Sequence, residues 1–152
     1  MHNLVKWLIG FVVVIVIILL LSGMYFFHVA QVRNPKSNQP DILRSKDNSL
    51  YRYENTFLAR HKQIWHETTR DGLKLDAWYV PADKKTNKTA ILAHGWHNNK
   101  TTMAIYGELF HELGYNVLIP DNRAHGDSQG KIIGYGWLDR RDYIQWLNQI
   151  IK

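Results

Sequence analysis

The beginning of the chain is dominated by one uninterrupted apolar run. Residues 7–27 are 21 consecutive positions without a charged side chain. A helix rises about 1.5 Å per residue, so this run would span roughly 31 Å, close to the thickness of a hydrocarbon core of about 30 Å. We therefore predict a transmembrane anchor over residues 1–28. Two alternatives are a cleaved signal peptide, whose apolar region is usually shorter, and a buried core helix, which seldom lacks polar positions all round.

The next segment, residues 29–60, is polar at first and then changes character. Two prolines among Asn, Ser and Gln side chains indicate a stalk. Apolar residues at i, i+3 and i+7 then predict a short juxtamembrane helix around residues 50–57. Asp47 or Ser49 is the expected N-cap of this helix, because a side-chain oxygen there can accept a hydrogen bond from a free backbone N–H group.

Two runs rich in β-branched and aromatic residues follow, at residues 64–69 and 73–80. The pair Asp71-Gly72 lies between them. A type I′ turn needs positive φ at both central residues, which Asp-Gly tolerates, so this pattern predicts a β-hairpin. Pro81 then ends the second strand.

The periodicity after residue 88 alternates between strand and helix. Short apolar runs predict strands at residues 89–93 and 116–120. Thr101 or Thr102 is the expected cap of an intervening helix, and a second helix is expected to begin near Leu138. The apolar face of the first helix is predicted to comprise Met103, Tyr106, Leu109, Phe110 and Leu113, before a stop at Gly114. The apolar face of the second is predicted to comprise Tyr143, Ile144, Leu147, Ile150 and Ile151. The fold class is therefore α/β, with a sheet that begins antiparallel and becomes parallel.

Composition narrows this picture only a little. The chain has 152 residues, a formal net charge of +6 and no cysteine. Its basic residues are scattered and its aromatic residues have core-like spacing, so we expect no nucleic-acid partner. A solvated basic surface, or attraction to anionic lipid headgroups beside the anchor, explains the charge better. The absence of cysteine excludes a disulfide framework.

The candidate chemistry lies in two loops that follow the predicted parallel strands. These loops read His94-Gly95-Trp96-His97 and Asp121-Asn122-Arg123-Ala124-His125-Gly126-Asp127-Ser128. In a parallel α/β sheet, ligands bind beyond the carboxyl ends of the strands, where both loops lie. Together with the hairpin before them, the loops resemble the α/β-hydrolase superfamily, and more narrowly its serine-aminopeptidase-like, membrane-anchored bacterial members. The resemblance covers roughly residues 60–152 and implies a partial hydrolase domain over residues 61–152.

This resemblance implies roles for individual residues. His94 and Gly95 end the third strand, and the backbone N–H of Trp96 would donate to an oxyanion formed during acyl transfer. In the loop that begins at Asp121, after the family's fourth strand, the resemblance implies that three residues brace the backbone: Asp121, Arg123 and Gly126. No cofactor and no metal are expected. Two other interpretations of His94 and His97 are residues that merely flank a turn, and a metal-binding pair, which would lack a third ligand nearby.

Ser128 lies in a segment that matches the nucleophile pattern Gly-x-Ser-x-Gly, residues 126–130. A nucleophile elbow requires a strand that runs directly into the serine, whereas the predicted strand ends near Pro120. The resemblance implies instead that Ser128 forms local hydrogen bonds. It is the remaining nucleophile candidate, because the other serines lie in the anchor or stalk. Neither His111 nor His125 can be assigned as a general base without a nucleophile in reach.

The resemblance therefore implies the N-terminal portion of a membrane-anchored serine hydrolase that acts on an ester, amide or similar acyl bond. The nucleophile elbow and the acid and histidine of a catalytic triad are absent from these 152 residues. We expect the chain to be inactive in this form, and whether it is an enzyme stays open. The fragment is also expected to fold poorly alone, because its third strand would be a bare edge. Alternatives are a single-pass binding module on a half-hydrolase scaffold, and a minimal hydrolase that uses Ser128.

Location and partners follow from the same two observations. Residues 7–27 are expected to contact membrane lipid, which places the chain in the cell membrane as a single-pass protein. The resemblance implies an extracellular globular part that acts on a small-molecule or peptide acyl substrate. The flanking charges favour the opposite orientation, because only Lys6 and the amino terminus precede the span, while four basic residues follow it: Arg33, Lys36, Arg44 and Lys46.

Overall fold

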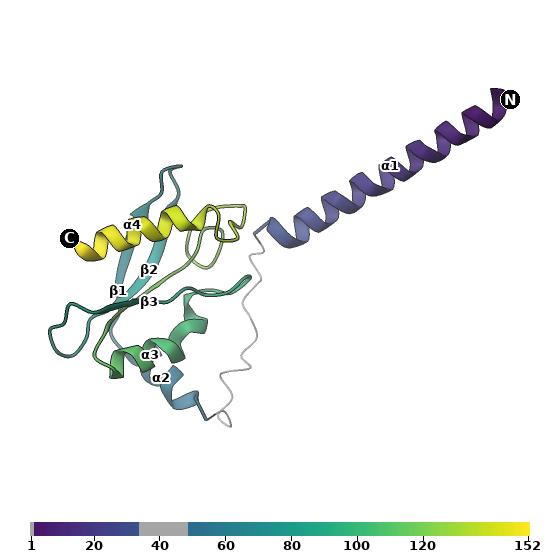
Figure 1. Cartoon of the computed structure of the whole chain (residues 1–152). Helices are drawn as coiled ribbons and strands as arrows, with labels where there is room; N and C mark the ends of the chain where they lie inside the picture. Colours follow the sequence, from purple (N-terminus) through teal and green to yellow (C-terminus); the bar gives the residue numbers. More distant parts are fainter. Residues whose placement is uncertain (1, 34–48) are drawn as a thin grey trace. The chain divides into compact units, whose positions relative to one another are not determined.

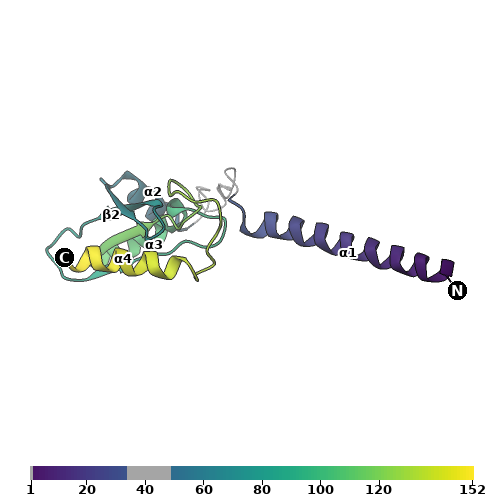
Figure 2. The same cartoon turned by 90° about the horizontal axis from the view of Figure 1, so that it is seen from above.

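A computed structural model describes residues 2–33 and 49–152, which divide into two compact units, residues 1–32 and 33–152. In the first unit, α1 (His2–Gln31) is one continuous helix (Figure 2). It is longer than the predicted span and apolar enough to cross a membrane, a property that signal sequences share. Most of the predicted stalk lies in residues 34–48, outside the described residues. The predicted cap residue Asp47 lies there as well.

The second unit is built on a four-stranded mixed sheet (Figure 1). Its strands are β1 (Gln63–Thr68), β2 (Lys74–Val80), β3 (Thr89–Ile91) and β4 (Asn116–Pro120). Their order is β1-β2-β4-β3, with β2 antiparallel to both β1 and β4, and β3 parallel to β4. The predicted change from antiparallel to parallel pairing is therefore correct. Among the described residues, β3 pairs with β4 alone, so its other edge carries no strand.

The turn between β1 and β2 differs from the predicted two-residue type I′ turn. Thr69 and Leu73 close the loop, because the Thr69 N–H donates to the Leu73 carbonyl at 2.9 Å. Leu73 N–H donates in turn to the Thr69 hydroxyl at 2.9 Å. Only Gly72 has a positive φ (85°) in this turn, and Asp71 does not. The extra loop residue gives a turn with a single left-handed glycine, which is the usual three-residue alternative.

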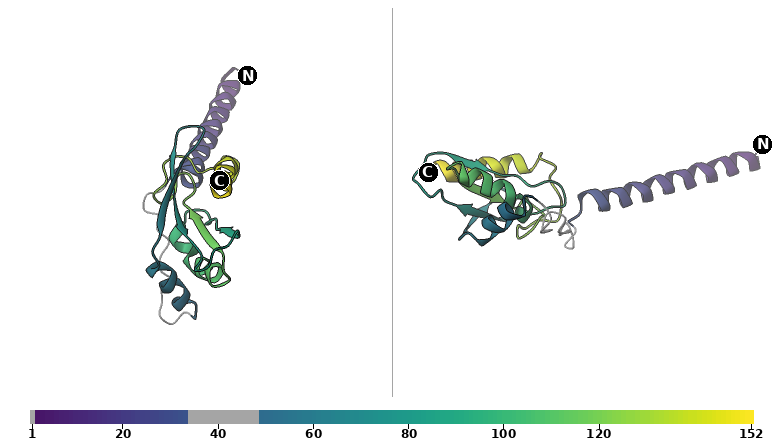
Figure 3. Two further views of the ribbon diagram at one scale, coloured as in Figure 1. Left: turned by 90° about the vertical axis from the view of Figure 1, so that its left-hand side faces the viewer. Right: turned by 90° about the horizontal axis from the view of Figure 1, so that it is seen from below.

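Helices cover both faces of the sheet, and adjacent residues of β4 divide between them. The helices are α2 (Tyr51–Ala59), α3 (Ala104–Glu112), which follows the 3-10 turn η1 (Lys100–Met103), and α4 (Asp139–Ile151). On one face α2 and α3 enclose a core of Phe57, Val80, Leu92, Ala104, Val117 and Ile119. On the other face α4 encloses Leu75, Ala77, Leu118 and Trp146. This alternation is what a strand buried on both faces requires, and α4 lies apart from α3 and α2 (Figures 1 and 3).

The helix faces predicted from apolar spacing are partly wrong. In α3 the predicted residues Tyr106, Leu109 and Leu113 are exposed, whereas Glu108 and His111 are buried. Close contact with α2 sets this rotation. A Cβ atom added to Gly107 would lie 2.7 Å from the Phe57 ring, and Arg60 forms a bidentate ion pair with Glu108 at 2.6 and 2.7 Å.

The face of α4 is rotated for a similar reason. Ile144, Leu147 and Ile151 are exposed, while Asp142 and Trp146 are buried against the sheet. Asp142 accepts hydrogen bonds from a buried arginine of the loop after β4, and this ion pair turns the polar side of the helix inward. The spacing of apolar residues cannot register such a pair.

The predicted caps also need correction. Asn99 caps the helical segment that begins at η1, because its side chain accepts from the Thr101 N–H at 2.9 Å. Neither Thr101 nor Thr102 has that role. The cap position of α2 is Leu50, which makes no side-chain cap hydrogen bond, so Ser49 does not cap it. Gly114 ends α3 as predicted, with φ of 81°.

Candidate functional site

Two loops meet at the carboxyl ends of β3 and β4, because these strands are parallel neighbours. We call them the β3 loop (residues 93–99) and the β4 loop (residues 121–136). They are joined by backbone-to-ring hydrogen bonds. The Asn122 N–H donates to His94 Nε2 at 3.0 Å, and the His97 N–H donates to His125 Nε2 at 3.3 Å.

His94 and His125 are therefore held as neutral rings. Because Nε2 of each ring accepts from a backbone N–H, the proton of each ring is on Nδ1. Nδ1 donates to the Gly95 carbonyl at 2.8 Å in His94 and to the Arg123 carbonyl at 2.9 Å in His125. Burial lowers the pKa of both histidines below the ordinary value. Neither ring has a free nitrogen with which to act as a general base in this arrangement.

The tip of the β3 loop is a strained turn that carries Trp96. Asn98 N–H donates to the Gly95 carbonyl at 3.2 Å, and His97 has a φ of 56°, which is unusual for a residue with a side chain. The half-exposed Trp96 ring stacks on His97 with ring centroids 3.7 Å apart. This turn and the stacking of the ring hold Trp96 at the wall of an open cavity.

This cavity has a volume of about 390 Å³ and is lined by residues of both loops and the start of α4. The lining residues include the sequence-predicted His94, Gly95 and Trp96, together with Asn122, His125 and Tyr143. The Tyr143 hydroxyl donates to the Asn122 side-chain oxygen at 2.7 Å, and burial raises the pKa of Tyr143 above its ordinary value. The volume suits a small organic ligand or a short acyl chain.

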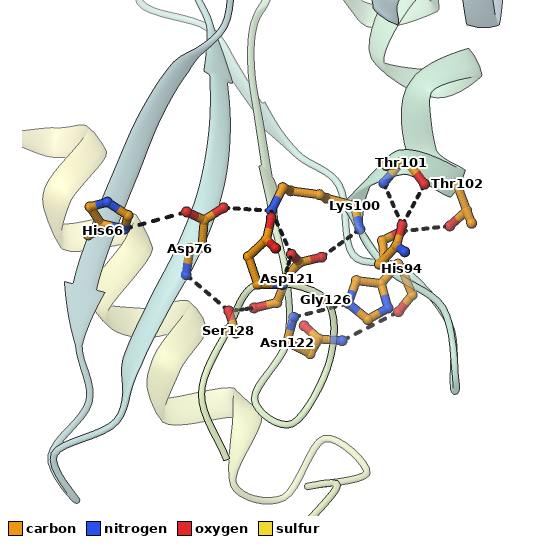
Figure 4. A network of polar contacts seen from close by, with 12 residues as sticks. His66, Asp76, His94, Lys100, Thr101, Thr102, Asp121, Asn122, Gly126 and Ser128 are labelled. Carbon is orange, nitrogen blue, oxygen red and sulfur yellow. Dashed lines mark hydrogen bonds and ion pairs between the residues drawn. The ribbon is translucent and has the colours of Figure 1, made fainter. Parts of the chain in front are cut away.

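Ser128 lies within the β4 loop and does not line the cavity. It is fully buried, and its hydroxyl donates to the Asp121 carbonyl at 2.6 Å (Figure 4). The same hydroxyl accepts from the Asp76 N–H at 3.0 Å. Strand β4 ends at Pro120, so no strand runs directly into the serine. Only the bond to Asp121 is local, because Asp76 lies 52 residues away on β2, and among the described residues the hydroxyl has no hydrogen bond to an imidazole ring.

Asp121 and Gly126 form the inner part of the β4 loop. The Asp121 carboxylate accepts from the Lys100 N–H at 2.7 Å and from the Asp127 N–H at 2.8 Å. Gly126 has a φ of 46°, and a Cβ atom at this position would lie 2.1 Å from the Asp121 carboxylate. Only glycine fits this position without displacement of the carboxylate.

Arg123 connects the β4 loop to two other elements. Its guanidinium group donates to Asp142 in α4 at 2.8 and 2.9 Å, and to Asp71 in the hairpin turn at 2.9 and 3.2 Å. Hydrogen bonds from Arg123 lower the pKa of Asp71 to about 2, whereas burial raises the pKa of Asp142. These are the contacts that a loop-bracing arginine needs.

Lys100 contacts both the sheet and the β4 loop, and this role was not predicted from the sequence. Its buried ammonium group contacts the carboxylates of Asp76 and Asp121, which Figure 4 labels, and that of Asp127, at 2.6 to 2.7 Å. The carboxylate oxygens of these aspartates lie within 4.8 Å of one another, a spacing that also suits a metal ion. A lone lysine after a polar loop carries no sequence signal that would distinguish it from a solvated one.

Comparison with known proteins places this geometry in a wider context. No protein-family model matches the chain. The protein YqkD of Bacillus subtilis (strain 168) is 32% identical over 130 residues, which cover 86% of this chain and 41% of that protein. This chain therefore spans about two fifths of the length of the curated relative that it matches.

Solved structures with a similar fold include an esterase. Esterase Pf2001 of Pyrococcus furiosus shares 32% identity, with a TM-score of 0.54 over 62% of this chain and 37% of the esterase. DcsB, solved in complex with its substrate analogue, has a TM-score of 0.52 at 24% identity over 59% of this chain and 32% of DcsB, and supports the fold alone. The chain thus has a hydrolase-like fold, of which the described sheet is a part.

Proposed function

We propose that this chain is the N-terminal portion of a membrane-anchored serine hydrolase that cleaves an ester, amide or similar acyl bond. The observation that carries the proposal is the β3 loop, held at the carboxyl end of β3 beside a cavity of about 390 Å³. Within this loop, Gly95 and Trp96 supply a backbone that can approach a ligand closely, and the Trp96 N–H is the proposed oxyanion donor. Similarity to an esterase at 32% identity supports the same reaction class.

We further propose that the chain belongs with the serine-aminopeptidase-like hydrolases, that α1 anchors it in the membrane through residues 7–27, and that the second unit lies on the extracellular side. The length and composition of α1 support the anchor. The substrate is a small molecule or peptide with an acyl bond, for which the cavity has sufficient volume.

The nucleophile in this proposal is not Ser128. A buried hydroxyl with two backbone partners cannot attack a carbonyl group without loss of both hydrogen bonds. The triad histidine is likewise not His94 or His125, because both rings are engaged on both nitrogens. Asp121, Arg123 and Gly126 act as loop-bracing residues. The 152 residues alone are therefore expected to be inactive.

The first test is the nucleotide sequence that follows the Lys152 codon. A Gly-x-Ser-x-Gly motif encoded within the next few tens of codons, in any frame, is the expected result. Its absence there would count against the proposal and favour a binding module.

The second test is biochemical and uses the full chain in detergent micelles. A fluorophosphonate probe is expected to leave the chain unlabelled, and to label a fusion of the chain to the part of YqkD that the alignment leaves out. In that fusion, Trp96→Pro removes the proposed donor and should lower ester hydrolysis by about 10²–10³-fold relative to Trp96→Ala, which keeps the N–H. Equal activity of the two variants would refute the oxyanion role. Labelling of the unfused chain that Ser128→Ala abolishes would restore Ser128 as the nucleophile.

A further inference from the structure

Lys100 lies where three separate parts of the fold converge. It begins η1, immediately after the β3 loop. Asp76 belongs to β2, Asp121 follows the last residue of β4, and Asp127 lies within the β4 loop. One ammonium group therefore connects the β3 loop, the sheet and the β4 loop (Figure 4). We call these four residues the Lys100 cluster.

The geometry matches the chemistry of an ammonium group. Lysine has three N–H donors and no acceptor, and the three carboxylates supply one acceptor each at 2.6, 2.7 and 2.6 Å. The Lys100 side chain is 3% exposed, and Asp121 is 1% exposed. Burial lowers the pKa of Lys100, but the hydrogen bonds to the carboxylates raise it by more, so the pKa lies above its ordinary value.

The cluster also resembles the ligand set of a hard cation. Three carboxylate groups whose oxygens lie within 4.8 Å of one another are a typical start of a calcium or magnesium site. Here the ammonium group lies within hydrogen-bond distance of all three. Without it, the buried Asp121 carboxylate and the partly buried Asp76 carboxylate would repel one another with no counter-charge, and the β4 loop would lose its charge contact with the sheet.

We propose that Lys100 is a positioning residue whose ammonium group acts as a built-in cation and fixes the β3 loop against the β4 loop. The role of Lys100 in oxyanion binding rests on the proposed function. Its role in holding the two loops together does not depend on that function, because it is argued from the contacts of Lys100 themselves. The backbone of Lys100 takes part as well, since its N–H donates to Asp121 at 2.7 Å.

The experiment uses the full chain in detergent micelles, labelled with 5-fluorotryptophan and observed by fluorine NMR. Trp96 reports on the β3 loop, and the exposed Trp137, whose ring lies against the Arg140 guanidinium group and not against the Lys100 cluster, is the internal reference. Single Trp→Phe variants assign the two resonances. In Lys100→Ala we expect the Trp96 resonance to shift and to broaden at least about twofold, while the Trp137 resonance stays unchanged.

A matched control is Lys62→Ala. The Lys62 ammonium group lies 5.1 Å from the centre of the Trp78 ring, much as that of Lys100 lies 5.5 Å from it, but Lys62 donates to two backbone carbonyls. Its removal should leave the Trp96 resonance in place. Millimolar calcium should restore the Trp96 resonance in Lys100→Ala and have no effect on the wild-type chain, because the vacated carboxylates can bind the ion.

Two results would overturn the proposal: an unchanged Trp96 resonance in Lys100→Ala, or no restoration by calcium. If Lys100→Ala does not fold, Asp127→Asn takes its place. Asp127 is 76% exposed, and its substitution weakens one of the three contacts of Lys100 at the surface. A smaller shift of the Trp96 resonance is then expected, and no shift would refute the proposal. Failure of the esterase tests with these NMR results intact would refute the proposed function and leave the role of Lys100 standing.

Discussion

At the scale of single residues, Gly126 determines whether the β4 loop can close. Its left-handed backbone (φ 46°) and the absence of a side chain allow the Asp121 carboxylate to lie against it. The carboxylate is in turn the acceptor for two backbone N–H groups and the Lys100 ammonium group. The close approach of this glycine therefore supports the three hydrogen bonds that the Asp121 carboxylate accepts.

We predict that Gly126→Ala destabilises the second unit by about 2–4 kcal/mol, because the methyl group overlaps a buried, charged partner that cannot move. Gly114→Ala is the control. Gly114 also has a positive φ, but no atom lies within 4 Å of its added Cβ, so only the backbone cost of about 1 kcal/mol is expected. Urea unfolding monitored by tryptophan fluorescence measures both. Equal losses would show that the contact with Asp121 does not matter.

Glu67 predicts a pH dependence of stability. Its buried carboxylate oxygens have no hydrogen-bond partner among the described residues, and burial, followed by the nearby charge of Asp142, raises its pKa from 4.5 to about 8. Between these values the unfolded chain releases the proton while the folded chain keeps it. The free energy of unfolding therefore falls as the pH rises from about 4.5 to about 8.

Glu67→Gln removes this titration without a change of shape. We expect the variant to become progressively more stable than the wild type from pH 5 to pH 8, by a difference on the order of 2–4 kcal/mol at the upper end. Thermal melting at several pH values tests this, with Glu112→Gln at the exposed end of α3 as the control. A difference that does not vary with pH would mean that Glu67 is ionised in the folded protein.

At the scale of elements, a bidentate ion pair fixes α3 against the residue that follows α2. Glu108 is 1% exposed, and its carboxylate depends on Arg60 for compensation. We predict that Arg60→Ala costs about 3–5 kcal/mol, because it leaves a buried charge unpaired. Arg60→Ala combined with Glu108→Leu should recover most of that loss. Chemical denaturation measures both, and Arg70→Ala, at an exposed position, is the control. No recovery in the double variant would indicate that Arg60 acts through packing alone.

The same pair explains which elements could be predicted from the sequence. Strand β4, the hairpin strands and the change to parallel pairing follow from local periodicity, and their predicted positions agree closely with the structure. The faces of α3 and α4 do not, because buried ion pairs to Arg60 and Arg123 set the rotation of each helix. Such pairs join residues 48 and 19 positions apart, beyond the reach of any local pattern.

The candidate site divides in the same way. The positions of the two loops follow from the strand order, since parallel neighbours place their carboxyl ends together. The engaged state of His94 and His125 and the burial of Lys100 depend on contacts between loops, which the spacing of residues within one loop cannot predict. Reading the Gly-x-Ser-x-Gly segment as a nucleophile elbow would have required a strand up to Ser128, and β4 ends at Pro120.

At the scale of the whole molecule, two features expose apolar groups in the described part of the second unit. The edge of β3 carries no strand, and Ile144 and Leu147 of α4 are about half exposed. Unpaired sheet edges and contiguous apolar surface favour association with other chains.

We therefore predict that residues 49–152 self-associate at micromolar concentration. Ile144→Lys combined with Leu147→Lys should shift the protein toward monomer with little change in the unfolding free energy, because both side chains are exposed. Sedimentation velocity measures the association. Trp146→Lys, at a fully buried neighbour, is the contrasting variant and should prevent folding. A wild-type protein that is monomeric throughout this concentration range would contradict the prediction.

The paired bonding of the two histidine rings has a consequence for transition-metal chemistry. Zinc, nickel and copper bind imidazole through a nitrogen lone pair, and in His94 and His125 the only such lone pair already accepts from a backbone N–H. To take up such an ion, either ring would have to release the amide of the opposite loop. Low concentrations of zinc should therefore not bind His94 or His125. Any zinc that does bind to either ring would break a hydrogen bond between the two loops.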